Sequence, residues 1–449
     1  MMDNDVNTYI SVSCDEDTVI EFTLDKPTTF NTVKFTEHIN KTHGSYIKYY
    51  KLEAVLGSNA EYTEIYRQDE MGNRIGVVNR TYTAQKFRLT ARASNIGGGI
   101  AEISFANDTG YDTANFRNVV YYTASRLPEV VATGYNEVMD ATDIILFDYG
   151  AWEADGSFTW STIYTETEMA KNLETLKEAI GEEKYNSLRI WFCLQNYNRA
   201  TVTDTATLFT TEASRKKLAD FSLDLCKKYG FYGVDIDYEF PERGYEDFND
   251  ENNAQRAKNW SNFSEFLVLA GDILHAEGYK LSAAMGPFYV QLSDAAVQAI
   301  DAVNVMTYGL VDNMGGYGRF CTYQTVQRSI DYFTGKGFDK SKLILGVPFY
   351  SMTIPRQKSE KSQEIRWYHL INRNPTLANN ADIWNNFFSN DAFDFYFNAP
   401  AIMRDKTYAA ISQGLGGVFC WCNGCDVEDG NPLSLADAIA NTITRFTAE

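Results

Sequence analysis

The sequence predicts an α/β fold: a (β/α)8 TIM barrel preceded by a smaller all-β sandwich domain. From residue 118 onward, eight short apolar segments alternate with helix-like segments, which is the order of a closed parallel barrel. Before residue 107, strand-like segments follow one another with turn signals between them, which is typical of a β-sandwich. We therefore expect two domains, residues 5–107 and 118–449, in keeping with the upper size of a single core.

The first domain is expected to be built from strands with alternating apolar side chains. In 19-VIEFTL-24, Ile20, Phe22 and Leu24 fall on one face, because side chains alternate along a strand. The polar stretch 107-NDTGYDTANF-116 is expected to be a linker. The other predicted strands of this domain cover 33–35, 50–56, 86–91 and 100–105.

The second domain carries the barrel pattern. An open doubly wound sheet is the alternative, but no G-x-G-x-x-G segment follows an early strand, which disfavours it. Helices are expected at 166–181, 212–230 and 257–278. The eight predicted barrel strands are 119–123, 144–149, 189–194, 232–240, 281–285, 303–308, 343–350 and 416–421.

Composition limits the classes of partner. The formal net charge is -20 over 449 residues, which argues against binding nucleic acid or an anionic membrane. No apolar run approaches the ~20 residues that span a bilayer, so no membrane span is expected. Seven cysteines make no disulfide framework. The cluster 419-FCWCNGC-425 lacks a second group of Cys or His ligands, so neither a metal nor a cofactor is expected.

The segment 232-YGVDIDYEF-240 contains three acids, and they are separated from one another by single residues. Asp235, Asp237 and Glu239 share one face of the predicted strand, with Cα atoms roughly 6.6 Å apart in succession. The apolar residues between them need contact with the helices, so the acids should face the barrel interior. Like charges this close cannot all ionise, and we expect at least one raised pKa.

Glu239 comes last, at the C-terminal end of the strand, where barrel active sites lie. A carboxylic acid with a raised pKa at this position suits protonation of a leaving oxygen. The simpler alternative is a hydrogen-bonded network of buried acids with no catalytic role. Three acids with a period of two at a barrel mouth favour the catalytic interpretation.

This segment resembles the signature of glycoside hydrolase family 18, which includes chitinases and endo-β-N-acetylglucosaminidases. That signature reads D-x-x-D-x-D-x-E, and this chain matches it at Asp235, Asp237 and Glu239. Tyr238 to Pro241 also resembles the chitinase continuation W-E-Y-P. One position departs, because Tyr232 stands where the first Asp belongs.

Four other segments are similar to the family's barrel. They are 306-MTY-308, 345-LGVPFY-350, 406-KTYA-409 and 416-GGV-418 with Trp421. Two more positions depart from the family pattern. Gly309 replaces an Asp after the sixth strand, and 193-CLQN-196 replaces S-x-G-G on the third.

The resemblance implies retaining hydrolysis assisted by the substrate. Glu239 would protonate the glycosidic oxygen, and the substrate's own 2-acetamido carbonyl would be the nucleophile. Asp237 would orient that amide, and Asp235 would share a proton with Asp237. Tyr308 would hydrogen-bond the acetamide oxygen, and Trp421 would pack against the sugar face.

Met285, Met306 and Tyr350 complete the expected substrate-binding set, although methionines at strand ends also fill barrels. The expected ligand is an N-acetylglucosamine-containing oligosaccharide or a glycoprotein glycan. The first residues, 1-MMDNDVNTY-9, are too acidic and polar for a signal peptide. The resemblance nevertheless leads us to expect a protein that is secreted or displayed at the cell surface.

Several alternatives remain open at this point. A chitinase cleaves chitin, whereas an endo-β-N-acetylglucosaminidase cuts the chitobiose core of N-glycans. An inactive lectin on the same barrel is another alternative, as is a glycosidase with two directly acting carboxylates ~5 Å apart. The N-terminal domain resembles the discoidin fold of family 32 carbohydrate-binding modules, with its first strands and loops shortened. We expect it to be a docked structural domain rather than a sugar-binding one.

Overall fold

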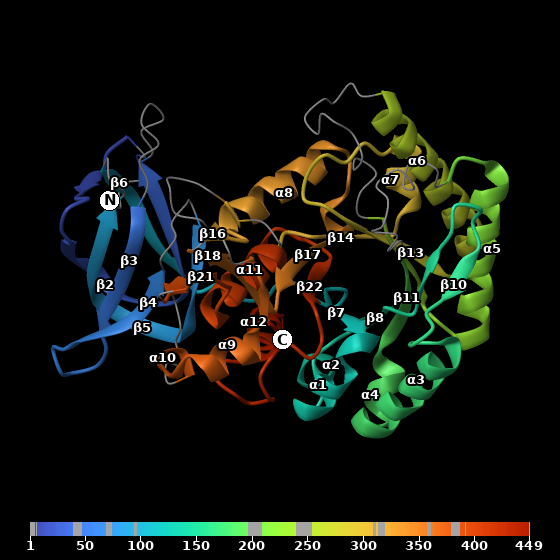
Figure 1. Ribbon diagram of the computed structural model, residues 1–449. Coiled ribbons are helices and arrows are strands. Elements are labelled where there is room, and N and C mark those ends of the chain that lie inside the picture. The colour runs from blue at the N-terminus through green and yellow to red at the C-terminus, as the bar shows by residue number, and fades with distance from the viewer. Residues whose placement is uncertain are drawn as a thin grey trace.

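The chain was analysed as a computed structural model. It describes residues 5, 7–38, 47–68, 74–93, 97–195, 209–238, 254–308, 311–312, 319–356, 361–378, 387–390 and 392–448. Figure 1 shows an antiparallel sheet on one side and a barrel surrounded by helices on the other.

A closed barrel of eight parallel strands forms the larger part, as predicted. Neighbouring strands follow the order β11-β12-β13-β14-β17-β22-β7-β8. The eight predicted segments all supply strands of this barrel. The strands are β7 (Arg117–Thr123), β8 (Asp143–Phe147), β11 (Arg189–Gln195), β12 (Gly233–Asp237), β13 (Lys280–Met285), β14 (Ala302–Val305), β17 (Leu343–Pro348) and β22 (Gly417–Trp421).

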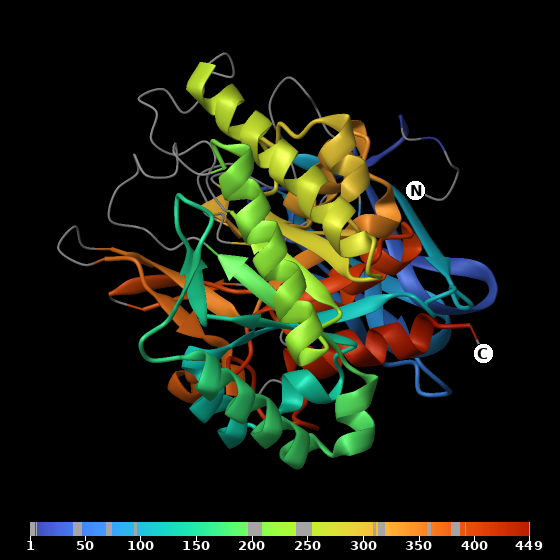
Figure 2. The same cartoon turned by 90° about the vertical axis from the view of Figure 1, so that its right-hand side faces the viewer.

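Helices cover the outside of the barrel. Figure 2 shows two long ones, α5 and α6, side by side across the barrel wall. No helix in the part of the chain that the structure describes is long and apolar enough to cross a membrane. The helices that follow barrel strands include α1 (Leu127–Ala132), α2 (Asn136–Met139), α3 (Glu166–Ile180), α4 (Glu182–Ser187), α5 (Glu212–Tyr229), α6 (Ala254–His275), α7 (Asp294–Ala299), α8 (Tyr323–Gly335), α11 (Pro400–Ser412) and α12 (Leu435–Phe446).

Helix α5 illustrates why the predicted helices form. The Thr211 side chain accepts a hydrogen bond from the Ser214 backbone N–H, which caps the first turn. Leu218, Leu225 and the adjacent Cys226 are buried against the barrel. Gly230 ends the helix at φ 69°, a left-handed conformation that costs glycine little.

The N-terminal region is all-β, as predicted, and its strands belong to one continuous antiparallel sheet. The strand order is β1-β6-β2-β5-β3-β4. The 21-residue β2 shifts register between Thr23 and Thr28 and again between Phe30 and Thr32, and such irregularities bend a strand. The strands are β1 (Ile10–Val12), β2 (Thr18–His38), β3 (Ile47–Val55), β4 (Tyr62–Gln68), β5 (Arg74–Ala93) and β6 (Gly98–Ala106).

Three further small sheets lie in the connections between barrel strands. The four-stranded sheet after β17 has the order β19-β18-β21-β20 and is accompanied by helices α9 and α10. These elements are β9 (Gly150–Trp152), β10 (Phe158–Trp160), β15 (Val311–Asp312), β16 (Arg319–Phe320), β18 (Tyr350–Pro355), β19 (Glu364–Arg366), α9 (Trp367–Arg373), α10 (Pro375–Ala378), β20 (Phe387–Ser389) and β21 (Phe393–Tyr396).

The sheet docks against α11 through a buried carboxylate. Asp405 has no exposed surface. It accepts hydrogen bonds from the Tyr66 hydroxyl at 2.7 Å, the Val77 backbone N–H at 2.7 Å and the Gln68 amide at 3.2 Å. A second contact joins the Tyr408 hydroxyl, also on α11, to the Asp108 carboxylate. Buried polar contacts of this kind hold the sheet in one position on the barrel.

We predict that Asp405→Ala destabilises the protein strongly. The substitution leaves the Tyr66, Gln68 and Val77 donors buried without this acceptor, at a cost of about 3 kcal/mol or more. Urea unfolding should show the loss as a lower midpoint. Asp220→Ala is the control, because Asp220 lies on the exposed face of α5 beside Lys216, and its midpoint should stay near that of the wild type. Equal midpoints for Asp405→Ala and the wild type would contradict the docking role.

Candidate active site

The predicted site residues gather where barrel strands end. Asp235 and Asp237 lie on β12, and Met285 is the last residue of β13. Met306 and Tyr308 follow β14, Tyr350 follows β17, and Trp421 ends β22. Glu239 and Gly309 lie outside the described residues. Side chains from the C-terminal ends of several strands are the usual components of a barrel active site.

Asp235 faces the barrel interior, as predicted, and has no exposed surface. Three other barrel strands supply its donors, and one of them, β13, is the neighbour of β12. The donors are the Ser282 hydroxyl on β13 at 2.6 Å, the Tyr121 hydroxyl on β7 at 2.7 Å and the Asn304 amide on β14 at 3.0 Å. The Asn304 amide also donates to the Tyr121 hydroxyl at 3.2 Å. The buried carboxylate is tolerated because these donors replace the hydrogen bonds that it would otherwise make to water.

The pKa of Asp235 is raised, and burial is the main cause. The expectation of a raised pKa is therefore confirmed, but repulsion between carboxylates is not the leading reason. Hydrogen bonds from Ser282, Tyr121 and Asn304 oppose the effect of burial. Burial and the nearby Asp235 also raise the pKa of the Cys193 thiol well above its usual value, so this cysteine is protonated at neutral pH.

Asp237 lies one pleat further along the same face and nearer the barrel mouth. Its exposed fraction is 7%, compared with 0% for Asp235. The strand ends at Asp237, so the predicted extension to residue 240 is wrong at Tyr238. The Tyr238 ring instead packs against Phe263 of α6 at 5.1 Å, on the helix side of the barrel as predicted.

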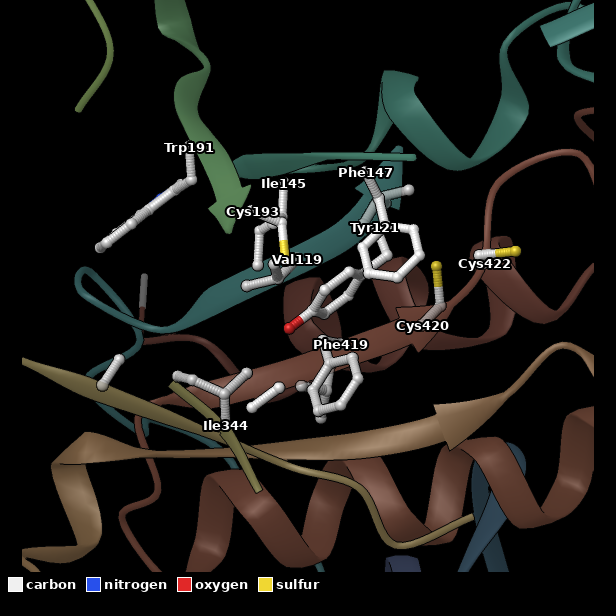
Figure 3. Close-up of a cluster of buried hydrophobic side chains, with 14 of the residues drawn as sticks. Val119, Tyr121, Ile145, Phe147, Trp191, Cys193, Ile344, Phe419, Cys420 and Cys422 are labelled. Carbon is white, nitrogen blue, oxygen red and sulfur yellow. The ribbon is translucent and has the colours of Figure 1, made fainter. Parts of the chain in front are cut away.

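Trp421 lies in an aromatic cluster at the barrel mouth. Its ring centroid is 4.9 Å from that of Phe147 and 5.4 Å from that of Tyr121. Tyr308 stacks nearly parallel to it, at 6.5 Å and 21°. Figure 3 shows Tyr121, Phe147 and Phe419 converging inside the barrel. Trp421 is partly exposed, so one part of the indole is held by the core and another part faces outward.

The other three predicted residues differ in how far solvent reaches them. Tyr350 is 6% exposed and meets the edge of Tyr308 at 6.3 Å. Met285 is 3% exposed and packs in the barrel core. Met306 is only partly buried, and its backbone N–H donates to the Met285 carbonyl at 2.8 Å. Met306 is thus the more accessible of the two methionines.

Several residues of this site escaped the sequence analysis. Tyr121 contacts both Asp235 and Trp421, yet it lies in a strand that was predicted only from its apolar character. Ser282 and Asn304 are single polar residues within apolar strands, which is the signal that could have found them. Gln195 pairs in register with Asp237, and its buried side-chain oxygen has no hydrogen-bond partner among the described residues.

No group of three or more metal-binding side chains is arranged to hold an ion within the described ranges. The seven cysteines are all free. Cys420, Cys422 and Cys425 are buried around the end of β22, and burial raises the pKa of Cys420 well above its usual value. Carboxylates, tyrosines and a tryptophan are among the described side chains at this mouth.

Comparison with known proteins identifies the family. The sequence profile of glycosyl hydrolases family 18 matches residues 117–426, which is more than half of the chain and nearly all of the barrel. The chain belongs to glycosyl hydrolase family 18. The predicted family resemblance is therefore confirmed for the barrel, while the profile does not extend to the N-terminal sheet.

Curated relatives of this family 18 chain are chitinases. The class V chitinase of Arabidopsis thaliana is 24% identical over 284 residues, which cover 54% of this chain and 70% of that protein. Probable chitinase 10 of Drosophila melanogaster is 21% identical over 243 residues, which cover 50% of this chain. The chain spans only 10% of that Drosophila protein, and 23% of chitinase A1 of Niallia circulans.

Solved structures share the fold. Catalytic domain 2 of the group II chitinase of Ostrinia furnacalis aligns with a TM-score of 0.59 and 17% identity, covering 74% of this chain and 98% of that chain. A chitinase of Bacteroides thetaiotaomicron aligns with a TM-score of 0.55 and 19% identity, covering 74% and 97%. At these identities the likeness establishes the barrel fold.

The loop that follows Trp421 is anchored by two buried carboxylates. Glu137 of α2 accepts hydrogen bonds from the backbone N–H groups of Cys425 at 3.1 Å and Asp426 at 3.0 Å. Asp426 in turn accepts from the backbone N–H groups of Leu435 and Ala436. Burial raises the pKa of Glu137, and burial together with Glu137 raises the pKa of Asp426 to about 7. The charge of Glu137 thus opposes ionisation of Asp426.

We predict that Glu137→Gln stabilises the protein at pH 8 but not at pH 5. Because the folded-state pKa values of Glu137 and Asp426 are raised, the fold favours their protonated forms. This stability is lost as the pH rises from the ordinary range of a carboxyl group through the raised pKa values. Glutamine keeps an acceptor for the two backbone N–H groups and cannot ionise. Thermal unfolding at the two pH values measures the difference.

Glu183→Gln is the matched control, because Glu183 is exposed on α4. It should show no such dependence on pH. A Glu137→Gln midpoint that exceeds the wild type equally at pH 5 and pH 8 would contradict the raised pKa of the pair.

Proposed function

We propose that this family 18 chain is a retaining glycoside hydrolase that cleaves β-1,4-linked N-acetylglucosamine, as a chitinase does. The arrangement on β12 carries the proposal. Asp235 is fixed in the core by three donors, and Asp237 follows on the same face near the mouth. This pattern suits a mechanism in which Asp235 and Asp237 share a proton and the acid at residue 239 donates one to the substrate.

In the proposed reaction, Glu239 donates its proton to the glycosidic oxygen as the bond to C1 breaks. The carbonyl oxygen of the substrate's 2-acetamido group forms the new bond to C1 and gives a positive oxazolinium ion. Asp237 orients the amide and stabilises the positive charge. Water then attacks C1 from the face that the leaving group vacated, and the bond between C1 and the acetamido oxygen breaks. The Glu239 carboxylate takes the proton of this water, and the configuration at C1 is retained.

The surroundings of Asp235 support its role in this cycle. The carboxyl group is buried and has a raised pKa, so it suits sharing a proton with Asp237 while the charge on Asp237 changes. Tyr308 and Trp421 stack nearly parallel at 6.5 Å. In the proposal, Tyr308 hydrogen-bonds the acetamide oxygen, and Trp421 supports the apolar face of the sugar.

The substrate class is proposed from the relatives. The Ostrinia furnacalis domain was solved with (NAG)5, and a class V chitinase of Nicotiana tobaccum with NAG4. A chitin oligosaccharide is therefore the first substrate to test, and a glycoprotein N-glycan the second. Secretion of the protein is part of the same proposal, since chitin lies outside cells.

The N-terminal sheet is proposed to stabilise the barrel rather than to bind sugar. Its contacts with α11 are buried and polar, which suits permanent docking. The resemblance to the discoidin fold stays a proposal, and so does the division into domains at residues 5–107 and 118–449.

We predict that Glu239→Gln abolishes hydrolysis of a chromogenic chitotriose while chitotriose still binds. Glutamine keeps the shape of the side chain but cannot donate the proton, so kcat should fall by about 1000-fold or more. The release of the chromophore measures turnover, and isothermal titration measures binding. Turnover of the variant at the wild-type rate would refute the assignment.

Two further substrates separate the alternatives within the same assay. A cellotrioside lacks the N-acetyl group and should not be cleaved; rapid cleavage would point to two directly acting carboxylates instead. Release of glycans from an N-glycoprotein, identified by mass, would indicate an endo-β-N-acetylglucosaminidase. Binding without any turnover by the wild type would indicate a lectin.

We also predict that Tyr232→Asp, which restores the family motif, changes kcat/KM by less than about twofold. Tyr232 precedes β12 at its N-terminal end, five residues before Asp237 and hence about 16 Å from it. It is 39% exposed and lies 5.1 Å from the ring of Trp191, between centroids. Steady-state kinetics on chitotriose provide the test, and a tenfold gain in the variant would show that the departure weakens the site.

A further inference from the structure

A cavity of about 270 Å³ opens beside Trp421 and Tyr350. Its walls come from parts of the chain that are far apart in sequence: the short helix η1 (Ala124–Arg126) after β7, the loop after β22, and β19 with α9. This volume is slightly below the roughly 300–1,000 Å³ of typical small-ligand sites. It suits one sugar unit or one substituent of a longer glycan.

The walls of this cavity are held together by tight contacts. The Tyr368 backbone N–H, on α9, donates to the Cys425 carbonyl at 3.0 Å. The Trp367 backbone N–H donates to the Phe349 carbonyl at 3.0 Å. A Cβ atom at Gly424 would lie 2.9 Å from the Arg126 carbonyl oxygen, so the loop packs directly against η1. The cavity is thus part of the folded structure and not a gap between loose segments.

The charge of this cavity runs against that of the whole chain. Its lining includes Arg126, Arg366 and Arg373, with Glu364 as the one carboxylate among the lining residues, although the chain carries a net charge of -20. Arg366 pairs with Glu129. Neither Arg126 nor Arg373 has an ion-pair partner among the described residues, so two guanidinium groups remain available.

The pKa of His369, which lines the cavity, depends on the charged groups around it. Its pKa is lowered, mainly by burial and then by the positive charge of Arg373, with a further contribution from Arg126. Glu129 acts in the opposite direction without reversing the shift. Among the charged groups, Arg373 contributes more than Glu129 and Arg126 adds to it, so the charges around the imidazole favour a bound anion.

We propose that this cavity binds an anionic substituent, a carboxylate or a sulfate, on the glycan that lies against Trp421. The proposal rests on the proposed function, because the cavity and the candidate site share Trp421 and Tyr350. Arginine suits this task, since its planar guanidinium matches carboxylate and sulfate oxygens through paired hydrogen bonds. The preferred substrate is then an acidic N-acetylglucosamine glycan rather than plain chitin.

The test compares three tetrasaccharides that all carry N-acetyl groups. One is neutral chitotetraose, one alternates N-acetylglucosamine with N-acetylmuramic acid and carries lactyl carboxylates, and one is 6-O-sulfated chitotetraose. Affinity is measured by isothermal titration with Glu239→Gln, and kcat/KM with the otherwise unchanged protein. We expect at least one charged tetrasaccharide to bind about 10- to 100-fold more tightly than the neutral one, with the preference weakening as salt increases.

Removal of the two unpaired arginines should abolish this preference. Arg126→Gln with Arg373→Gln should bind the charged and the neutral tetrasaccharides with equal affinity. Arg373→Gln alone changes an exposed residue, so it should fold and show a partial loss. Arg328→Gln is the matched control, because Arg328 is exposed on α8 and does not line the cavity.

The outcomes separate this inference from the proposed function. Cleavage of chitotetraose with no preference for either charged glycan would overturn the inference and leave the hydrolase intact. A preference that persists in the double variant would also overturn it. Tight binding of a charged tetrasaccharide, lost in the double variant and without cleavage of any of the three, would support the cavity and refute the hydrolase.

Discussion

A buried carboxylate at the centre of the barrel is the constraint on which the rest of the site depends. Removing Asp235 from water costs several kcal/mol, and the chain offsets this cost with donors from β7, β13 and β14. These strands are far apart in sequence, yet their hydroxyl and amide groups must meet within a few tenths of an ångström. The closed barrel provides that register, because each strand is fixed by hydrogen bonds to two neighbours.

Tyr121 extends this constraint from the acids to the aromatic residues. Its hydroxyl donates to Asp235 at 2.7 Å, and its ring lies 5.4 Å from that of Trp421. A shift of β7 would therefore disturb the acid and the tryptophan together. On the other side of Trp421, Glu137 fixes the following loop through backbone N–H groups. The indole is held from both directions, which is what a preorganised binding surface needs.

The sequence predicted the barrel well because the signals for it are local. Each barrel strand is a short apolar run, and helices such as α5 have a capping residue and a periodic apolar face, so all eight barrel segments could be placed. Strand ends were less predictable. Residues 303–308 were expected to be extended, but β14 stops at Val305, and Asp148 after β8 adopts a φ of 75°. The partners of Asp235 were not identified from the sequence, because Ser282 meets it only through the register of β12 and β13, and Asn304 lies one strand further, on β14.

The chemistry and the charge of this site come from different parts of the chain. The candidate catalytic carboxylates lie on β12, a strand locked into the barrel core, whereas the unpaired arginines come from η1 and α9, which lie outside the barrel ring. Loop and insertion residues can vary without disturbing a rigid scaffold. Binding to a remote substituent lowers the free energy of substrate and transition state alike, so it selects the glycan without altering the chemical step. Trp421 lies between the barrel core and the arginine-lined cavity, since it packs on Tyr121 and also lines that cavity. A family 18 barrel can thus keep the geometry of its core strands while the segments around its mouth set the charge of the adjoining cavity.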